Sequence, residues 1–300
     1  MVPTDTMSGS KGVDMSVVVG YDGSEGSERA LQWALDEARL RKVALQILSV
    51  WEEPMVDMGF GGGAIVDPGL AEVMKERGEQ TAAAGLALVE HAGIEVSAQA
   101  VVGPAAAALV EASETADLLV TGSHSKRGVA EILLGSTSSQ VATHSTCPTI
   151  VVRPKELTNQ RLGVAIDGSD PGGRALDFAF DDASRRGWKL LVIHAWDVHV
   201  VGFDVDASTY PKGGIIDEVR EAEDRLSAEV LAGHRDRYPD VEIEFHLGRG
   251  HADHVVLEAS ENCDLLVVGS RGHGGFASLM LGSVSNRVLH HAECSVAVVH

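Results

Sequence analysis

The chain contains one domain-sized pattern twice. The segment VVVGYDGSEGSERALQWALDEARLRKVALQILSVW, which starts at Val17, matches LGVAIDGSDPGGRALDFAFDDASRRGWKLLVIHAW, which starts at Leu162, with an offset of 145 positions. Further on, EASETADLLVTGSHSKRG matches EASENCDLLVVGSRGHGG with an offset of 147. Solenoid repeats are much shorter, roughly 20–45 residues, so each copy is a domain. We predict a disordered leader at 1–14, domains at 15–153 and 161–300, and a linker at 154–160.

Within each copy, short apolar segments alternate with segments of helical periodicity. In the first copy, strands are expected at 16–21, 44–51, 95–102, 117–122 and 149–152, and helices at 27–42, 70–92, 105–113 and roughly 138–144. The second copy repeats the strands at 162–166, 189–196, 241–247, 264–269 and 295–299. Such alternation is typical of a parallel sheet covered on both faces. The prediction is an α/β, Rossmann-like fold: two tandem doubly wound five-stranded parallel sheets of order 3-2-1-4-5.

Two consequences follow from this fold. The last strands, TIVV at 149–152 and SVAVV at 295–299, lie at sheet edges, and exposed apolar edges favour pairing. We therefore expect the two domains to pair there as an internal pseudo-dimer. Association of two whole chains stays open, with a homodimer as the working expectation. The glycine-bearing segments 55–69 and 198–214 are predicted to be lids or disordered loops.

Composition excludes several classes of protein. A formal net charge of −20 argues against nucleic-acid binding, which needs a basic face. The chain contains no run of 18 apolar residues, so no membrane span is predicted. The leader lacks the apolar region of a signal peptide. Three scattered cysteines suit neither a disulfide framework nor a zinc site, so a reducing cytoplasm is expected. Cys147 and Cys294, at matching places, are interpreted as core thiols.

A glycine-rich segment, VVGSRGHGGFASLMLGS at 267–283, follows the fourth strand of the second copy. Its G-x2-G-x9-G-S spacing ends at a predicted helix start with serine caps, where free N–H groups favour an anion. A glycine-rich turn with an ordinary helix cap is the alternative. Asp22 and Asp167, in matching Asp-Gly-Ser sequences, also have two interpretations: a helix-capping turn or a ligand contact. Their repetition beside the glycine loops favours ligand contact.

Together these motifs resemble the universal stress protein family over nearly the whole chain, as a tandem member of the ATP-binding type. The resemblance implies an adenine-nucleotide alpha-hydrolase-like fold that holds ATP, with or without Mg²⁺, in each domain. Aspartate would lie by the ribose, backbone of the second strand by the adenine, and the glycine loop by the ribose and phosphates. The implied nucleotide-binding residues are Gly20, Asp22, Val50, Gly122, Ser123, Ser125, Gly128, Gly135, Ser136 and Ser138 in the first domain, and Ala165, Asp167, Ala195, Gly269, Ser270, Arg271, Gly272, Gly274, Gly282, Ser283 and Ser285 in the second.

The first domain departs from this pattern at one position. Ser125 stands where Gly272 stands in the second domain. If that place needs a positive φ, serine costs about 1–2 kcal/mol, and its side chain would crowd the phosphates or donate a hydrogen bond to them. We therefore predict weaker binding in the first domain. Lys126 and Arg127 beside it either compensate with charge or are solvated loop cations.

No catalytic or metal-binding residue is assigned. His251, His254 and His273 cluster in the second copy, but no HExxH pattern exists. Neither a G-x-S-x-G elbow nor a P-loop sequence is present. The leading hypothesis is a non-catalytic, ATP-binding regulator of the stress response. The alternatives are a slow ATP-hydrolysing enzyme of the same fold and a nucleotide-free interaction module.

Overall fold

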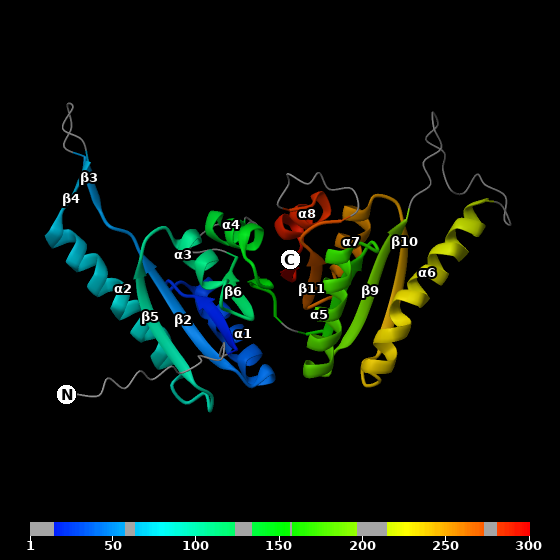
Figure 1. Ribbon diagram of the computed structural model, residues 1–300, viewed down its shortest axis with the longest axis horizontal. Helices are drawn as coiled ribbons and strands as arrows, with labels where there is room; N and C mark the ends of the chain where they lie inside the picture. The colour runs from blue at the N-terminus through cyan, green and yellow to red at the C-terminus, as the bar shows by residue number, and fades with distance from the viewer. Residues whose placement is uncertain (1–14, 58–63, 124–133, 157, 197–214, 273–280) are drawn as a thin grey trace, which may run out of the picture.

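The two halves of the chain form one continuous ten-stranded sheet in the computed structural model (Figure 1), which describes residues 15–57, 64–123, 134–156, 158–196, 215–272 and 281–300. The strands of the first half are β1 (Ser16–Gly20), β2 (Ala44–Trp51), β5 (Val96–Val102), β6 (Leu118–Gly122) and β7 (Thr149–Val152). Those of the second half are β8 (Arg161–Ile166), β9 (Lys189–Trp196), β10 (Ile243–Arg249), β11 (Leu265–Gly269) and β12 (Ser295–Val299).

The strand order confirms the predicted topology. It runs β10-β9-β8-β11-β12-β7-β6-β1-β2-β5, so each half has the order 3-2-1-4-5 and is parallel throughout. The halves meet where β7 and β12 pair antiparallel, with Ile150 opposite Ala297. The apolar edges thus cover each other, as expected for an internal pseudo-dimer.

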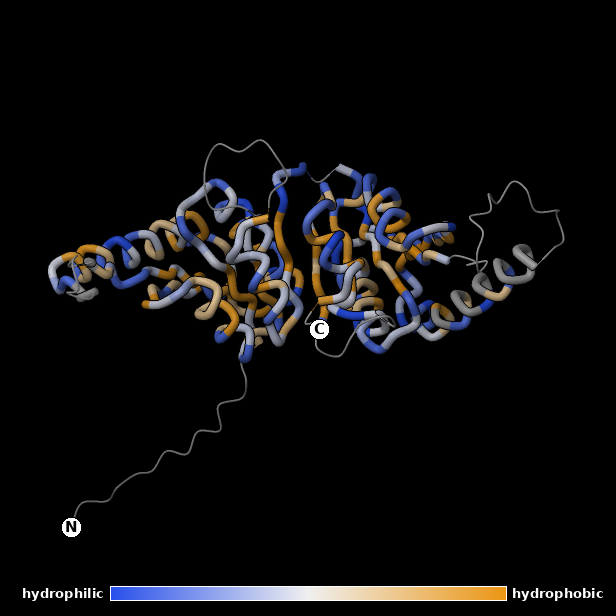
Figure 2. Tube along the Cα trace, turned by 90° about the horizontal axis from the view of Figure 1, so that it is seen from above, coloured by the Kyte–Doolittle hydropathy of each residue, from blue (hydrophilic) through white to orange (hydrophobic). Residues whose placement is uncertain are grey.

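Helices cover both faces of the sheet. One core cluster joins strand residues of both halves to α1 (Glu25–Arg41), α2 (Pro68–Val89), α5 (Asp170–Arg186) and α6 (Ile215–Arg237). On the opposite face, α3 (Ala105–Ala112), α4 (Ser136–His144), α7 (Ala252–Ser260) and α8 (Ser283–His291) build the other clusters. Figure 2 shows hydrophobic residues concentrated along the strands between these layers. Burial on both faces explains why most strands read as continuous apolar runs.

One segment differs from its prediction. Within the expected lid or disordered loop at 55–69, β3 (Met55–Asp57) and β4 (Ala64–Val66) form a two-stranded antiparallel sheet. Three-residue strands are too short to show a periodicity of two, so no sequence pattern predicts them. The first helical turns of α2 contain no buried residue until Gly78, and in Figure 1 they extend outward with this hairpin. The leader 1–14 and the whole of the second predicted loop, 198–214, lie outside the described residues.

Four charged side chains join the two halves beneath the sheet. Arg41 contacts Glu37 at 2.9 Å and Asp182 at 3.2 Å, and Arg186 contacts Asp182 at 2.8 Å and also Glu37. Glu37 and Asp182 are repeat equivalents, as are Arg41 and Arg186. Both carboxylates are completely buried. Burial raises the pKa of Asp182 to about 6, whereas the two guanidinium groups outweigh burial at Glu37 and lower its pKa.

The linker is held by the second half. The carboxylate of Asp264 accepts hydrogen bonds from the backbone N–H groups of Thr158, Asn159 and Gln160 at 2.6–3.0 Å. Arg153, at the end of the first half, donates to the carbonyl of Leu289 on α8 at 2.6 Å. These contacts fix the relation of the halves in addition to the shared sheet.

Candidate functional site

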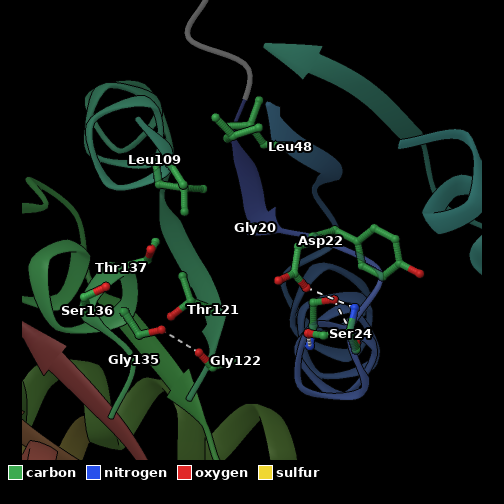
Figure 3. Close-up of a pocket in the computed structure, with 15 residues that line it drawn as sticks. Gly20, Asp22, Ser24, Leu48, Leu109, Thr121, Gly122, Gly135, Ser136 and Thr137 are labelled. Carbon is green, nitrogen blue, oxygen red and sulfur yellow. Dashed lines mark hydrogen bonds between the residues drawn. The ribbon is translucent and has the colours of Figure 1, made fainter. Parts of the chain in front are cut away.

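A cavity of about 280 Å³ lies at the carboxyl ends of β1, β2 and β6 in the first half (Figure 3). It is lined by Gly20, Tyr21, Asp22, Ser24, Ser27, Leu48, Val50, Ala105, Leu109, Thr121, Gly122, Gly135, Ser136, Thr137 and Ser138. The strand order reverses between β1 and β6, and ligands of doubly wound sheets bind at such switch points. Most first-domain site residues predicted from the sequence therefore surround one cavity.

The walls of the cavity differ in polarity. Leu48, Val50 and Leu109 supply apolar surface from β2 and α3, while Asp22 and the first turn of α4 supply polar groups. In Figure 3, Leu48 and Leu109 are at one end of the cavity and Gly135, Ser136 and Thr137 are at another. An apolar wall beside converging polar groups suits a ligand with a flat apolar part and a polar or anionic part.

The α4 helix begins without a side-chain cap. Its N-cap is Gly135, and the first intrahelical bond runs from the N–H of Ser139 to the Gly135 carbonyl at 3.0 Å. The three preceding N–H groups, from Ser136 to Ser138, have no acceptor within the helix. Such N–H groups and the helix dipole attract an anion. The expected serine caps are wrong: the caps are glycines, and Gly282 occupies the same place before α8.

Two predicted phosphate contacts use their hydroxyls in the fold. Ser138 donates to the carbonyl of Gly122 at 2.6 Å, and its counterpart Ser285 donates to the carbonyl of Gly269 at 2.5 Å. Both serines are buried. Each hydroxyl ties the start of a helix to the end of the neighbouring strand, so backbone N–H groups, rather than these hydroxyl protons, face a ligand at this turn.

Each aspartate stabilises its own Asp-Gly-Ser turn, which agrees in part with the capping-turn interpretation. Oδ1 of Asp22 accepts from the N–H of Ser24 at 3.0 Å, and Oδ1 of Asp167 accepts from the N–H of Ser169 at 3.0 Å. The glycine inside each turn has φ near +76° or +79°, which favours glycine. One carboxylate oxygen therefore shapes the turn. Asp22 nevertheless lines the cavity, and Oδ2 of Asp167 faces Gly272.

Both glycine loops are closed by the same hydrogen bond. Gly135 donates its N–H to the carbonyl of Ser123 at 2.8 Å, and Gly282 donates to the carbonyl of Ser270 at 2.7 Å. Ser123 and Ser270 are buried, and Arg271 is exposed beside the second loop. This closure brings each strand end to the start of the following helix. Three predicted site residues, Ser125, Gly128 and Gly274, lie outside the described residues, as do Lys126 and Arg127.

The remaining predicted site residues of the second half lie at matching places. Ala165 and Ala195 sit near the ends of β8 and β9 and pack partly against the core. Ser283 is the first residue of α8. A Cβ added to Gly282 would lie 3.5 Å from the Cα of Arg271, which is ordinary contact. The structure therefore brings the Gly269–Gly272 strand end beside Gly282, as the sequence predicts.

Gly122 and Gly269 are needed for packing. A Cβ at Gly122 would lie 2.6 Å from the Gly26 carbonyl oxygen, and one at Gly269 would lie 2.8 Å from the Pro171 carbonyl oxygen. Both contacts are to backbone at the start of α1 or α5, which cannot move aside cheaply. These glycines allow the strand end and the helix start to meet, and this contact positions the site.

Replacing Gly122 by alanine is expected to lower the free energy of unfolding by about 1–3 kcal/mol through overpacking. Gly233→Ala is the matched control, because nothing lies within 4 Å of an added Cβ there. That control should stabilise α6 by up to about 1 kcal/mol. Urea unfolding followed by circular dichroism measures both. Equal stability of Gly122→Ala and wild type would contradict the packing argument.

Gly272 is required for a reason that differs from the predicted one. Its φ is outside the left-handed region, so the condition under which a serine would strain the backbone at this place is not met. A Cβ at this position would lie 2.3 Å from Oδ2 of Asp167. Glycine therefore leaves room for the aspartate carboxylate. The cost of a side chain here falls on Asp167 and not on the backbone.

A second cavity, of about 620 Å³, lies between α7 and α8. His251, His290 and His291 line it, together with the ion pair of Arg287 and Asp253 at 3.1 Å. Across the described ranges, no three His, Cys, Asp or Glu side chains are grouped as a metal ion would require. His273 is outside those ranges.

Cys147 and Cys294 are core thiols, as predicted, and Cys263 is a third one. Cys147, Cys263 and Cys294 are all buried and unpaired with one another. Burial raises the pKa of Cys147 and Cys263 to about 12 and that of Cys294 to about 11. Thiols of this kind are poor nucleophiles at neutral pH. No helix in the described part of the chain has the length and apolar character needed to cross a membrane.

Comparisons with known proteins agree with this architecture. The model of the universal stress protein family matches residues 15–153 and again residues 158–300. A universal stress protein of Mycolicibacterium smegmatis is 33% identical over 299 residues, covering 95% of this chain and 97% of the relative. One from Mycobacterium tuberculosis is 32% identical over 294 residues, covering 95% and 96%.

Solved structures share the fold over both halves. The crystal structure of a universal stress protein from Archaeoglobus fulgidus superposes with a TM-score of 0.66 at 24% identity and covers 95% of each chain. A putative universal stress protein from Pseudomonas aeruginosa gives a TM-score of 0.61 at 18% identity, covering 95% and 92%. The duplicated sequence, the pseudo-twofold sheet and the two matches of the family model lead to one conclusion: the chain belongs to the universal stress protein family, with two copies of its domain in tandem.

Proposed function

We propose that each domain binds an adenine nucleotide, ATP in the first instance, and that the protein acts as a non-catalytic regulator of the stress response. The observation that carries the proposal is the cavity at the β1–β6 switch point. There an apolar wall, a carboxylate and an uncapped helix start converge. Its volume, about 280 Å³, is at the lower end of the range for ligand pockets, roughly 300–1,000 Å³.

The polar and apolar groups fit the parts of a nucleotide. Leu48, Val50 and Leu109 would contact the base, which is flat and mostly apolar. Asp22 would accept hydrogen bonds from ribose hydroxyls, and the first N–H groups of α4 would donate to phosphate oxygens. Backbone donors bind phosphate even on an acidic protein with a net charge of −20, because the nest supplies local positive potential. Mg²⁺ would be carried by the phosphates.

The lining supports binding more than catalysis. Among the described residues around the cavity, Asp22 and Tyr21 are the only side chains that ionise. Burial raises the pKa of Tyr21, which keeps it protonated, and one oxygen of Asp22 holds its own turn. Neither is a poised general base. A slow ATPase and a nucleotide-free interaction module remain the competing hypotheses.

Nucleotide content is the direct test. Purified protein is denatured, and released nucleotide is identified by absorbance and mass spectrometry. Titration with ATP by calorimetry then gives the stoichiometry, which is expected to be two per chain. If the protein neither carries nucleotide nor takes up ATP, the interaction module is favoured. Steady phosphate release that Asp167→Asn abolishes would instead favour the enzyme.

Gly272→Ala is expected to weaken ATP binding in the second domain at little cost to folding. The new Cβ displaces the Asp167 carboxylate, whose Oδ2 would be 2.3 Å away. Loss of a charged hydrogen bond to the ribose corresponds to about tenfold or more in affinity, while the unfolding midpoint without ligand should hardly change. Calorimetry and thermal unfolding measure the two effects. A folding defect without an affinity change would show that Asp167 serves only its turn.

We extend the proposal to cellular context and assembly. Three buried thiols suit a reducing cytoplasm, and a homodimer of whole chains is proposed in addition to the internal pseudo-dimer. Light scattering coupled to gel filtration measures the mass directly. A mass of 31.6 kDa in dilute solution would exclude the homodimer.

A further inference from the structure

Thr121 has a buried hydroxyl that finds no hydrogen-bond partner in the part of the chain that the structure describes. It is the fourth residue of β6, and its side chain is only 4% exposed. Within the described residues, Oγ1 makes no hydrogen bond. The residue lines the cavity, and Figure 3 shows it beside Ser136 and Thr137 at the start of α4.

A hydroxyl buried in this way destabilises a fold that does not use it. Removing a hydroxyl from water without a new hydrogen bond costs free energy. Other buried hydroxyls of this domain are satisfied: Ser138 donates to the Gly122 carbonyl at 2.6 Å, and Ser145 donates to the Val141 carbonyl at 2.7 Å. The Thr121 hydroxyl therefore differs from these two.

The second domain shows that the fold itself has no need of this hydroxyl. Its counterpart, 147 positions later, is Val268, which has the same shape without the oxygen. Val268 is 2% exposed and packs into a hydrophobic cluster with Val256 and Val288. The same position near the strand end thus carries a polar side chain in the first domain and an apolar one in the second.

The position of Thr121 indicates what it would bind. It lines the same cavity as the apolar Leu109 and directly precedes Gly122, whose carbonyl accepts a hydrogen bond from Ser138 on α4. An oxygen that enters between the apolar wall and the α4 N–H groups would therefore pass beside Oγ1. On a nucleotide, the group between base and phosphates is the ribose with its 5′ oxygen.

We infer that Thr121 donates a hydrogen bond to an oxygen of the ribose-phosphate part of the nucleotide, and that the two domains consequently differ in specificity. This inference rests on the proposed nucleotide-binding function. The first domain recognises the ligand with one side-chain donor that Val268 cannot supply in the second. This hydrogen bond would partly offset the loss of nucleotide affinity that the sequence predicts for the first domain because of Ser125.

The test uses Thr121→Val and Thr121→Ser in the full chain that also carries Gly282→Trp, so that only first-domain binding is recorded. Without ligand, Thr121→Val should raise the thermal midpoint by about 2–4 °C, since an unpaired hydroxyl is removed. With ATP, the same variant should bind about 3- to 10-fold more weakly. Thr121→Ser keeps the hydroxyl and should stay within about twofold of its parent. Val268→Thr, in a chain carrying Gly135→Trp, should strengthen second-domain binding.

Two results would overturn the inference while ATP still binds the parent protein. A lower midpoint of Thr121→Val without ligand would reveal a structural partner for the hydroxyl. Unchanged ATP affinity of Thr121→Val would show that the nucleotide does not contact it. Absence of any ATP binding in the wild-type chain would instead remove the proposed function, and the inference with it.

Discussion

Replacing Arg186 by alanine is expected to lower the free energy of unfolding by about 3–5 kcal/mol, because it removes one of the two cations that the buried carboxylates share. Arg186 is 6% exposed and contacts both Glu37 and Asp182, which are completely buried. Its guanidinium also lies over the rings of Trp33 and Trp188 at 4.9 and 4.8 Å. Arg41 alone would then have to neutralise two carboxylates. Urea unfolding followed by circular dichroism measures the loss.

The neighbouring arginine is the matched control. Arg185 forms an i,i+4 ion pair with Asp181 at 2.8 Å, as Arg186 does with Asp182, but its side chain is 38% exposed. Solvent screens such a pair, so Arg185→Ala should cost at most about 1 kcal/mol. Similar losses for the two variants would show that burial does not decide the strength of this cluster. Arg186→Met, which keeps apolar contact with the tryptophans, separates loss of charge from loss of packing.

Gly282→Trp is expected to abolish nucleotide binding in the second domain and to leave the first unaffected, so that ATP per chain falls from two to one. Gly282 is the N-cap of α8, where the helix N–H groups begin. Its φ of −68° suits any residue, and an added Cβ makes only ordinary contacts of 3.5 Å or more. The indole would therefore fill the phosphate position without straining the backbone. Titration calorimetry with ATP gives the stoichiometry.

Gly233→Trp on α6 is the control for adding an indole, since nothing lies within 4 Å of an added Cβ there. It should retain two nucleotides per chain. The thermal midpoint of Gly282→Trp without ligand should stay near that of the wild type. Two full sites in Gly282→Trp would contradict the assignment of the glycine loop, and two empty sites would show that the domains bind nucleotide as a coupled pair.

The glycine-serine pattern predicted where the site is but not what each residue does there. Gly135 and Gly282 stand at helix starts, as the spacing implied. Gly122 and Gly272 are glycines for steric reasons that involve other parts of the chain. A side chain at Gly122 would clash with the backbone of Gly26 on α1, and one at Gly272 would clash with the carboxylate of Asp167. A pattern shows that glycine is present, but only neighbours in space show whether φ, packing or ligand access requires it.

The sequence predicts the duplication, the order of the ten main strands and their helices, and the pairing of 149–152 with 295–299; the antiparallel direction of that pairing is a finding of the structure. These predictions follow from periodicity and from the need to cover apolar edges, both of which are local properties of the chain. Which polar groups find partners depends on how the elements pack in space. Glu37 and Arg186 meet although 149 positions separate them, whereas Thr121 meets no partner among the described residues. Burial and hydrogen bonding depend on distances that arise only when the helices pack on the sheet, so no local pattern encodes them.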